Sequence, residues 1–261
     1  MLFRPVLIVT IGLCLVACGD STPAPSDSST SDSATDSATD SAVDSAADAS
    51  VTDGGAVMCD APAMRSGEGT YYDFADGTGN CSFPATPDDL MVGAMNHTDY
   101  AASAACGACA AITGPTGSVT VRIVDRCPEC PAGDIDLSPE AFSRIAELSA
   151  GRVPISWTLV PCEVTGLVVY HFKDGSNLWW TAVQIRNHRH AVTHFEYLAE
   201  DGSYVDVPRV DYNYFVKDDG MGEGPFTFRI TDVHGSVISD TDIPLLDDAD
   251  APGTVQFPAC E

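Results

Sequence analysis

The sequence is poor in positive charge. Among its 261 residues there are 12 lysines and arginines against 38 aspartates and glutamates, which gives a formal net charge of -26 at pH 7. Nucleic-acid binding depends on contacts from lysine and arginine to phosphate, so this balance argues against a nucleic-acid partner. It argues equally against electrostatic docking on anionic lipid or on pectin-like polymers, and it favours a neutral or cationic partner.

The sequence also lacks an apolar run of the length, about 20 residues, that crosses a bilayer as a stable helix. A shorter apolar stretch from Val6 to Val16 follows Arg4 and leads into Leu15-Val16-Ala17-Cys18. These last four residues resemble the signal box of bacterial lipoproteins, in which the cysteine is lipidated and becomes the new N-terminus. Residues 1–18 are therefore predicted to be a lipoprotein signal peptide with Cys18 as the lipidation site, an ordinary signal peptide being the alternative.

Large apolar side chains are nearly absent from residues 19–56, where aspartate, serine, alanine and threonine predominate. A segment of this composition cannot offset the entropy cost of ordering, so we predict a disordered acidic tether that its like charges extend. We expect this tether to hold the folded part clear of the membrane, which the chain contacts only through its N-terminal lipid. The expected location is the outer membrane or the cell surface, with release outside the cell as a variant.

Eight cysteines follow the tether, and an even number of cysteines in an exported chain is typical of disulfides. They are Cys59, Cys81, Cys106, Cys109, Cys127, Cys130, Cys162 and Cys260. Two C-x-x-C pairs among them also satisfy the spacing of a zinc ribbon. Behind an export signal thiols oxidise, so we favour disulfides between strands and loops, whose pairing the sequence does not choose, and we predict no metal and no cofactor.

Residues 57–161 are predicted to form a mainly β domain, because short alternating stretches are split by glycine, proline and aspartate. The clearest strand is 119–124. Residues 134–137 alternate as well, which places Asp134 and Asp136 on one face.

One helix is predicted in this domain. Ser138 can cap it, Pro139 fits its first turn, an apolar stripe continues to Leu148, and Gly151 ends it.

Residues 162–261 are predicted to form a second domain, an antiparallel β-sandwich, because short strands recur with turn residues between them. The expected strands are 166–172, 180–187, 194–198, 203–207, 226–232 and 236–240.

Several motifs resemble those of expansins. In the first domain they are Gly67-x-x-Thr70-Tyr71-Tyr72, Ala105-Cys106-Gly107-Ala108-Cys109, Val124-Asp125-Arg126-Cys127-Pro128 and residues 133–142, and in the second domain they are residues 172–188 and 210–216. The resemblance implies a mainly β fold: a six-stranded double-psi β-barrel with a short helix, packed against an Ig-like antiparallel β-sandwich that binds carbohydrate.

The resemblance places Thr70 and Asp136 in a polysaccharide groove of the barrel, with Asp125 beside them. Asp136 corresponds to the aspartate that wall loosening requires in the family. It stands just ahead of a helix N-terminus, which favours the carboxylate, whereas burial would raise its pKa and suit a proton donor. The sequence does not decide between these influences. Cys127 stands where the family often has a tyrosine.

The resemblance also implies that Trp179, Trp180 and Tyr212 form a flat line on which glucan rings stack, with Lys173 nearby. Adjacent residues of a regular strand point to opposite faces, so both tryptophans are exposed only if Trp179 lies in the preceding loop. The same alternation places Gln184 with Trp180 on the face that meets water.

Three histidines, His188, His190 and His194, share one parity and suggest a metal site, but an exposed strand face explains them more simply. Hydrolysis would need a general acid and a separate base, and no second aspartate matches the resemblance, Asp73 and Asp125 being only nominal candidates.

We therefore expect a monomeric, non-hydrolytic protein that binds cellulose or another neutral β-glucan and loosens the contacts between wall chains. Peptidoglycan is a further candidate partner. The alternatives are a glycoside hydrolase or lytic transglycosylase-like enzyme with Asp136 as its acid, and a carbohydrate-binding surface adhesin.

Overall fold

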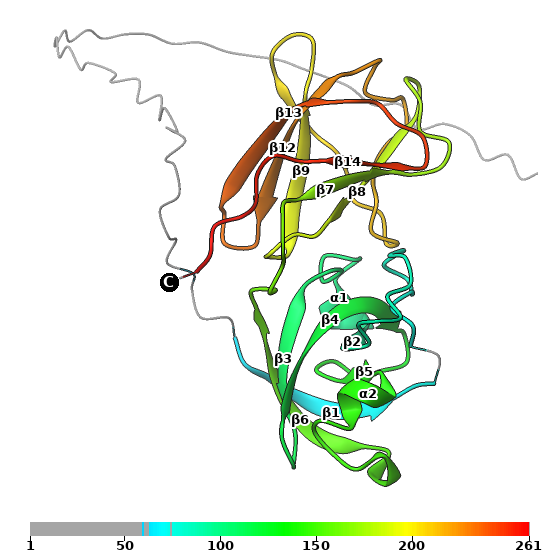
Figure 1. Cartoon of the computed structure of the whole chain (residues 1–261), viewed down its shortest axis with the longest axis vertical. Helices are drawn as coiled ribbons and strands as arrows, with labels where there is room; N and C mark the ends of the chain where they lie inside the picture. Colours follow the sequence, from blue (N-terminus) through cyan, green and yellow to red (C-terminus); the bar gives the residue numbers. More distant parts are fainter. Residues whose placement is uncertain (1–58, 60–62, 74, 261) are drawn as a thin grey trace, which may run out of the picture. The chain divides into compact units, whose positions relative to one another are not determined.

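The structure is a computed structural model that describes residues 59, 63–73 and 75–260 (Figure 1). The predicted signal peptide of residues 1–18, with the lipidation site Cys18, and the predicted tether of residues 19–56 lie outside the described residues. In the part of the chain that is described, no helix is long and apolar enough to cross a membrane.

The first six strands form a closed barrel in the order β1-β5-β2-β4-β3-β6. They are β1 (Arg65–Tyr71), β2 (Val92–Asn96), β3 (Cys109–Thr113), β4 (Ser118–Cys127), β5 (Ile135–Leu137) and β6 (Val153–Val160). The pairs β1–β5 and β2–β4 are parallel, and the other neighbours are antiparallel. The predicted strand 119–124 lies inside β4, and the predicted mainly β fold with a six-stranded barrel is confirmed.

The helices of the barrel domain are short: α1 (His97–Tyr100), α2 (Pro139–Phe142) and the 3₁₀ turn η1 (Leu148–Ala150). Ser138 caps α2 as predicted, since its Oγ accepts from the backbone N–H of Ala141 at 3.0 Å. The single helix predicted from Pro139 to Gly151 is wrong, however, because α2 ends at Phe142. The Ile145 carbonyl accepts a 3.0 Å bond from Thr116 in the β3–β4 turn, which occupies an oxygen that a continuing helix would need.

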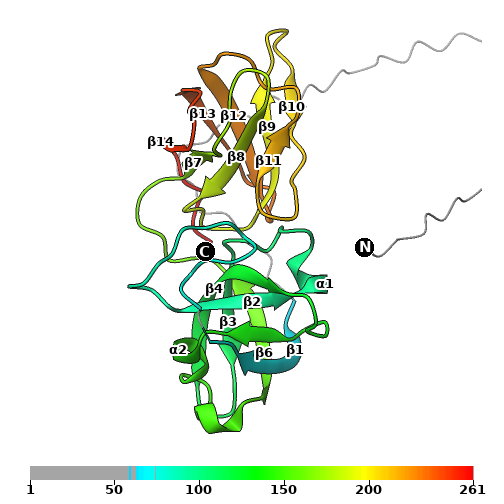
Figure 2. The same ribbon diagram turned by 90° about the vertical axis from the view of Figure 1, so that its right-hand side faces the viewer.

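The remaining strands form two antiparallel four-stranded sheets, β10-β9-β12-β13 and β11-β8-β7-β14 (Figure 2). They are β7 (Val169–Phe172), β8 (Thr181–Arg186), β9 (Val192–Leu198), β10 (Tyr204–Asp206), β11 (Phe215–Lys217), β12 (Phe226–Asp232), β13 (Val237–Ile243) and β14 (Ala249–Pro252). The sequence analysis anticipated six of these strands and missed β11 and β14. Phenylalanines from both sheets meet in the core, among them Phe172, Phe195, Phe215 and Phe228.

Barrel residues cover part of the β8 sheet, and Gln184 shows how. Its side chain is fully buried, and its Nε2 donates to the carbonyl oxygen of Cys81 at 2.9 Å. The prediction that Gln184 meets water is therefore wrong: the residue faces outward from its own sheet, but the segment around Cys81 covers that face.

All eight cysteines of the folded part are paired. The disulfides are Cys59–Cys260, Cys81–Cys106, Cys109–Cys162 and Cys127–Cys130. The cysteines with zinc-ribbon spacing are thus divided among three disulfides, and they do not form a zinc ribbon.

Candidate functional site

The parallel pairing of β1 with β5 brings Thr70 and Asp136 together. They are register partners, and Thr70 Oγ1 donates a hydrogen bond of 2.5 Å to Asp136 Oδ1. Ile135 and Leu137, on either side of Asp136, are fully buried, so the half-buried Asp136 side chain points away from the barrel core. We call Thr70, Asp136 and the neighbouring Asp125 the groove residues.

Burial is the main influence on the Asp136 carboxyl, and it raises the pKa above the ordinary value of 3.8. The hydrogen bond from Thr70 and the charge of Arg152 lower the pKa, whereas Glu129 and Asp125 raise it. The helix that follows, α2, has only four residues. The sequence left open whether the helix N-terminus or burial decides the pKa of Asp136, and burial has the larger effect.

Replacing Asp136 with asparagine is expected to raise the melting temperature at neutral pH by a few degrees. A raised carboxyl pKa means that the folded chain holds the proton more tightly than the unfolded chain does, so stability falls as the pH rises through that pKa. Asparagine keeps the oxygen that accepts from Thr70 and carries no charge. The gain should vanish at about pH 3, where the aspartate is protonated in both states; calorimetry at the two pH values measures it, and an equal gain at both would exclude this cause.

The other acids of this region are already engaged. Asp125 Oδ1 accepts from the backbone N–H groups of Asn80 at 2.6 Å and Arg126 at 2.8 Å, so it fastens the loop around Asn80 to β4. Asp134 is buried and accepts from the backbone N–H of Glu68 at 2.8 Å. Its Oδ2 also lies 3.7 Å from Nη1 of Arg152, whose charge acts on Asp136 as well, so Asp134 supports the barrel beside the groove residues.

Tyr72 belongs to the same region, although the sequence analysis named it only within a motif and gave it no role. Its N–H donates to Leu137 at 3.0 Å, which extends the β1–β5 ladder and places its side chain on the side of Thr70. Its hydroxyl oxygen is buried and has no hydrogen-bond partner among the described residues. Burial, Asp125 and Asp136 raise the pKa of Tyr72 above its ordinary value of 10.0, so the phenol stays neutral. Its position two residues after Thr70, on the same face of the strand, is the feature of the sequence that could have identified Tyr72.

The two adjacent tryptophans lie at a turn that precedes β8. β8 begins at Thr181, and Asn177 and Trp180 form an isolated bridge around that turn. Trp179 therefore escapes the alternation of a regular strand, and 72% of its surface is exposed. Trp180 is half-buried and packs against the cluster of Ala182, Tyr214 and Val216. Trp179 thus lies in the loop before β8, which is the placement that the exposure of both rings required.

Aromatic side chains continue from Trp180 into a small cluster. Tyr212 is half-buried, and its ring centroid lies 5.9 Å from that of Tyr214. Lys173 Nζ lies 5.8 Å from the centroid of the Tyr214 ring. Tyr214 thus connects Lys173 with Tyr212 from beneath, a supporting role that the sequence did not reveal. We call Trp179, Trp180 and Tyr212 the platform.

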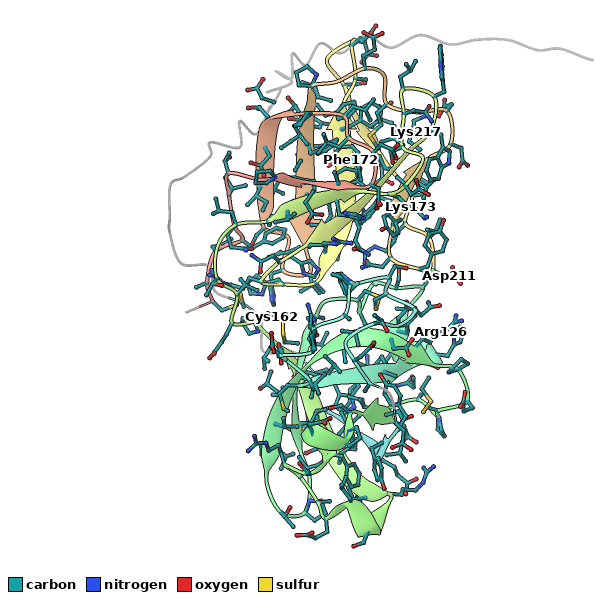
Figure 3. The ribbon with its side chains drawn as sticks, turned by 45° about the vertical axis from the view of Figure 1, so that its right-hand side comes forward. Arg126, Cys162, Phe172, Lys173, Asp211 and Lys217 are labelled. Atoms are coloured by element: carbon teal, nitrogen blue, oxygen red, sulfur yellow. A yellow bond between two sulfur atoms is a disulfide. The ribbon has the colours of Figure 1, made fainter. Side chains whose placement is uncertain are left out.

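Asp211 connects the platform to the barrel (Figure 3). Its carbonyl oxygen accepts from Asn80 Nδ2 at 2.7 Å, and its carboxylate lies 3.9 Å from Arg126 Nη1. Because Asp211 precedes Tyr212, and because Asn80 and Arg126 are both held by Asp125, these contacts join the platform to the groove.

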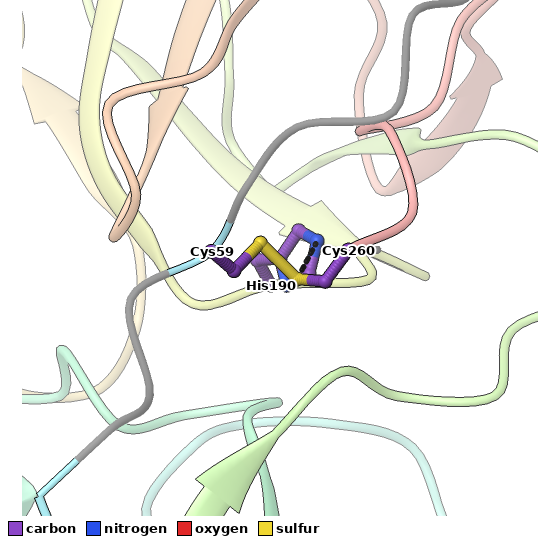
Figure 4. Close-up of side chains that lie close together, drawn as sticks. All are labelled: Cys59, His190 and Cys260. Carbon is purple, nitrogen blue, oxygen red and sulfur yellow. Dashed lines mark hydrogen bonds between the residues drawn. A yellow bond between two sulfur atoms is a disulfide. The ribbon is translucent and has the colours of Figure 1, made fainter.

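The histidines do not form an exposed strand face, as the simpler interpretation had it, because His188 and His190 are buried. Ligand atoms of Cys59, His190 and Cys260 lie within 4.8 Å of one another (Figure 4). Both sulfurs belong to one disulfide, and His190 Nε2 is 2.9 Å from the carbonyl oxygen of Pro258, to which it must donate. Neither the disulfide sulfurs nor the protonated Nε2 can then ligate a metal, so these atoms do not form a metal site.

The structure is thus a closed barrel that carries a hydrogen-bonded threonine–aspartate pair on its outer side, joined to a sandwich that presents tryptophan and tyrosine rings. This combination defines a class of barrel-and-sandwich proteins. A family model described as "Lytic transglycolase" matches residues 93–157. Over 205 residues the chain is 35% identical to Expansin-YoaJ of Bacillus subtilis, a match that covers 75% of this chain and 87% of that protein. Expansin-like protein 5 of Dictyostelium discoideum is 33% identical over 67% of this chain and 77% of its own length.

Solved structures agree with these relatives. The crystal structure of the Clavibacter michiganensis expansin superposes with a TM-score of 0.70 at 31% identity, over 75% of this chain and 99% of that one. A mutant of the same expansin, in complex with cellohexaose, matches equally well. The chain belongs to the expansin family.

Proposed function

We propose that this chain binds cellulose or a related neutral β-glucan and loosens the non-covalent contacts between wall chains without cutting them. The observation that carries the proposal is the exposed ring of Trp179, next in the chain to Trp180, which packs on the same small cluster as Tyr212. Flat aromatic faces suit the apolar faces of sugar rings at low entropy cost. Membership of the expansin family and the relative crystallised with cellohexaose support this choice of ligand.

Loosening is proposed to take two steps. The platform first adsorbs on a glucan chain. The groove then receives a length of that chain, and the hydroxyl of Thr70 and the carboxyl of Asp136 replace hydrogen bonds that the chain had made to its neighbours. Replacing one set of hydrogen bonds by another is nearly neutral in free energy, so the exchange needs no covalent step.

The strongest rival is an enzyme, a glycoside hydrolase or a lytic transglycosylase-like protein. The raised pKa of Asp136 suits a general acid, and the family model over residues 93–157 carries a lytic name. An inverting glycosidase also needs a free carboxylate base, and Asp125 is engaged by two backbone N–H groups. Incubation with amorphous cellulose decides the matter: we expect adsorption without release of reducing sugar, and steady release would make the chain a hydrolase.

A plain adhesin, in which the barrel is inert, would adsorb on cellulose in the same way. A pull-down panel across cellulose, xylan, chitin and peptidoglycan identifies the preferred wall polymer but does not separate these two functions. Extension of a wall strip under load does, since only a loosening protein produces it.

Adsorption on cellulose is expected to depend weakly on salt, and pectin is expected to bind poorly at low salt. Thirty acidic and 11 basic residues follow Gly54, so the folded part repels an anionic polymer, and a neutral glucan feels no such force. Depletion assays at about 10 and about 500 mM salt measure both effects. Tight pectin binding that salt abolishes would contradict a neutral ligand.

Export and anchoring complete the proposal. We place the monomeric chain at the outer membrane or cell surface, held through a lipid on Cys18, with residues 19–56 as the tether. The sequence Leu15-Val16-Ala17-Cys18 supports this location. If a Cys18→Ser variant stayed in the membrane fraction, the lipid anchor would be wrong.

A further inference from the structure

A cleft of about 750 Å³ lies apart from the groove and the platform. Strand β4, the segment 160–165 that leads from the barrel to the sandwich, and residues 186–188 at the end of β8 line much of it. No groove or platform residue is among its lining. In Figure 3, Cys162 of this cleft and the pair Arg126 and Asp211 lie on opposite sides. Ligand sites commonly measure about 300–1,000 Å³, so the cleft has the size of one.

Arg122 lines this cleft, and its donors are incompletely used. The guanidinium lies 5.4 Å from the centroid of the Phe83 ring, and Nη2 is 3.3 Å from Thr86 Oγ1. Nε is buried and has no hydrogen-bond partner among the described residues. Asp89 acts on Arg122 only at a distance, and burial, the larger influence, lowers the pKa of Arg122. Burial closes Nε off from the cleft, but Nη1 has no hydrogen bond among the described residues and is not buried, so a ligand that brings an acceptor to Nη1 would be favoured.

The other residues of the cleft decide what kind of acceptor fits. Asp89 and Glu163 line it too and would repel a carboxylate or a phosphate. His188 adds no positive charge at neutral pH, because burial lowers its pKa to about 4. Arg186 is already bonded to neighbouring side chains. A sugar hydroxyl, by contrast, can accept from Arg122 and donate to either acid.

We propose that this cleft is a second saccharide-binding site, which takes neutral sugar residues with Arg122 as their principal hydrogen-bond donor. The site shares the ligand class of the proposed function, but it does not depend on the platform. With one glucan chain on the platform and another in the cleft, the protein would hold two wall chains at once and keep them from rejoining.

Calorimetric titration of the full-length chain with cellohexaose tests this site. The double variant Trp179→Ala/Trp180→Ala is expected to keep a weaker binding event. Adding Arg122→Met should weaken that event by about tenfold, the ratio that about 1.4 kcal/mol produces. Oligogalacturonate of the same length, which carries carboxylates, should not bind there.

Arg144→Met is the matched control, because Arg144 is an exposed arginine of the barrel outside the cleft, and it should leave the titration unchanged. The melting temperature of Arg122→Met should not fall, since methionine can cover Phe83 without burying an unpaired charge. If the double variant binds no cellohexaose, or if Arg122→Met leaves its affinity within about twofold, the cleft is not a saccharide site. Failure of the wild type to adsorb on cellulose would instead overturn the proposed function, whatever Arg122 does.

Discussion

Trp179→Ala is expected to weaken adsorption on cellulose by about thirtyfold while the fold remains intact. Tryptophans at the centre of a binding surface commonly contribute about 2 kcal/mol or more when truncated to alanine, and about 2 kcal/mol corresponds to that ratio. The ring is 72% exposed, so its removal should leave little trace in the melting temperature. Depletion isotherms on cellulose and a thermal melt measure the two effects.

Val237→Ala is a suitable control for that experiment. Val237 is also exposed, at 55%, but it lies on β13 in the other sheet of the sandwich. Its replacement should leave adsorption unchanged. Trp180→Ala is a less clean test, because Trp180 packs against the cluster of Ala182, Tyr214 and Val216, which its loss would disturb. Unaltered adsorption by Trp179→Ala would mean that the platform does not bind glucan.

Asp136→Ala is expected to abolish extension of a cellulosic wall under load and to leave adsorption on cellulose near the wild-type level. Asp136 is the only partner that accepts from the Thr70 hydroxyl among the described hydrogen bonds, so its replacement removes the carboxyl and also leaves the Thr70 hydroxyl without the group that orients it. The platform lies in the other domain and keeps its rings. Extension measured at equal bound protein separates loss of loosening from loss of binding.

Two further variants define this result. Thr70→Val keeps the shape of the side chain and removes its hydroxyl, so a partial loss of extension is expected. Asp73→Ala removes an exposed acid just after β1 and should change nothing. Wild-type extension by Asp136→Ala would show that the groove mechanism is wrong. Loss of activity in Asp73→Ala would make Asp73 a candidate general base for hydrolysis.

Local patterns in the sequence predicted local structure well. The predicted strand 226–232 coincides with β12, because alternation of buried and exposed residues is set within the strand itself. The predicted helix after Ser138 was too long, because the contacts that end it come from a distant segment and not from the helix itself. Nothing near Ile145 in the sequence shows that the β3–β4 turn takes its carbonyl oxygen, or that Gly117 packs so closely on Arg144 that an added Cβ would lie 2.5 Å from its carbonyl oxygen.

The residues of the candidate site were likewise predictable only where local sequence identifies them. Trp179, Thr70 and Asp136 stand in motifs that identify them from the sequence alone. Gln184 and His188 were misplaced, because a pattern in one strand cannot show that another domain covers its outer face. Tyr214 and Arg122 were missed since their neighbours come from distant segments. The cysteine pairing likewise depends on which loops the fold brings together.

A cellulosic wall strip held under constant load, with reducing ends counted in the same sample, decides between loosening and cutting. With wild-type protein we predict that the strip lengthens while the number of reducing ends stays at the level of the untreated strip. Lengthening that appears only together with new reducing ends would show that the glucan chains are cut.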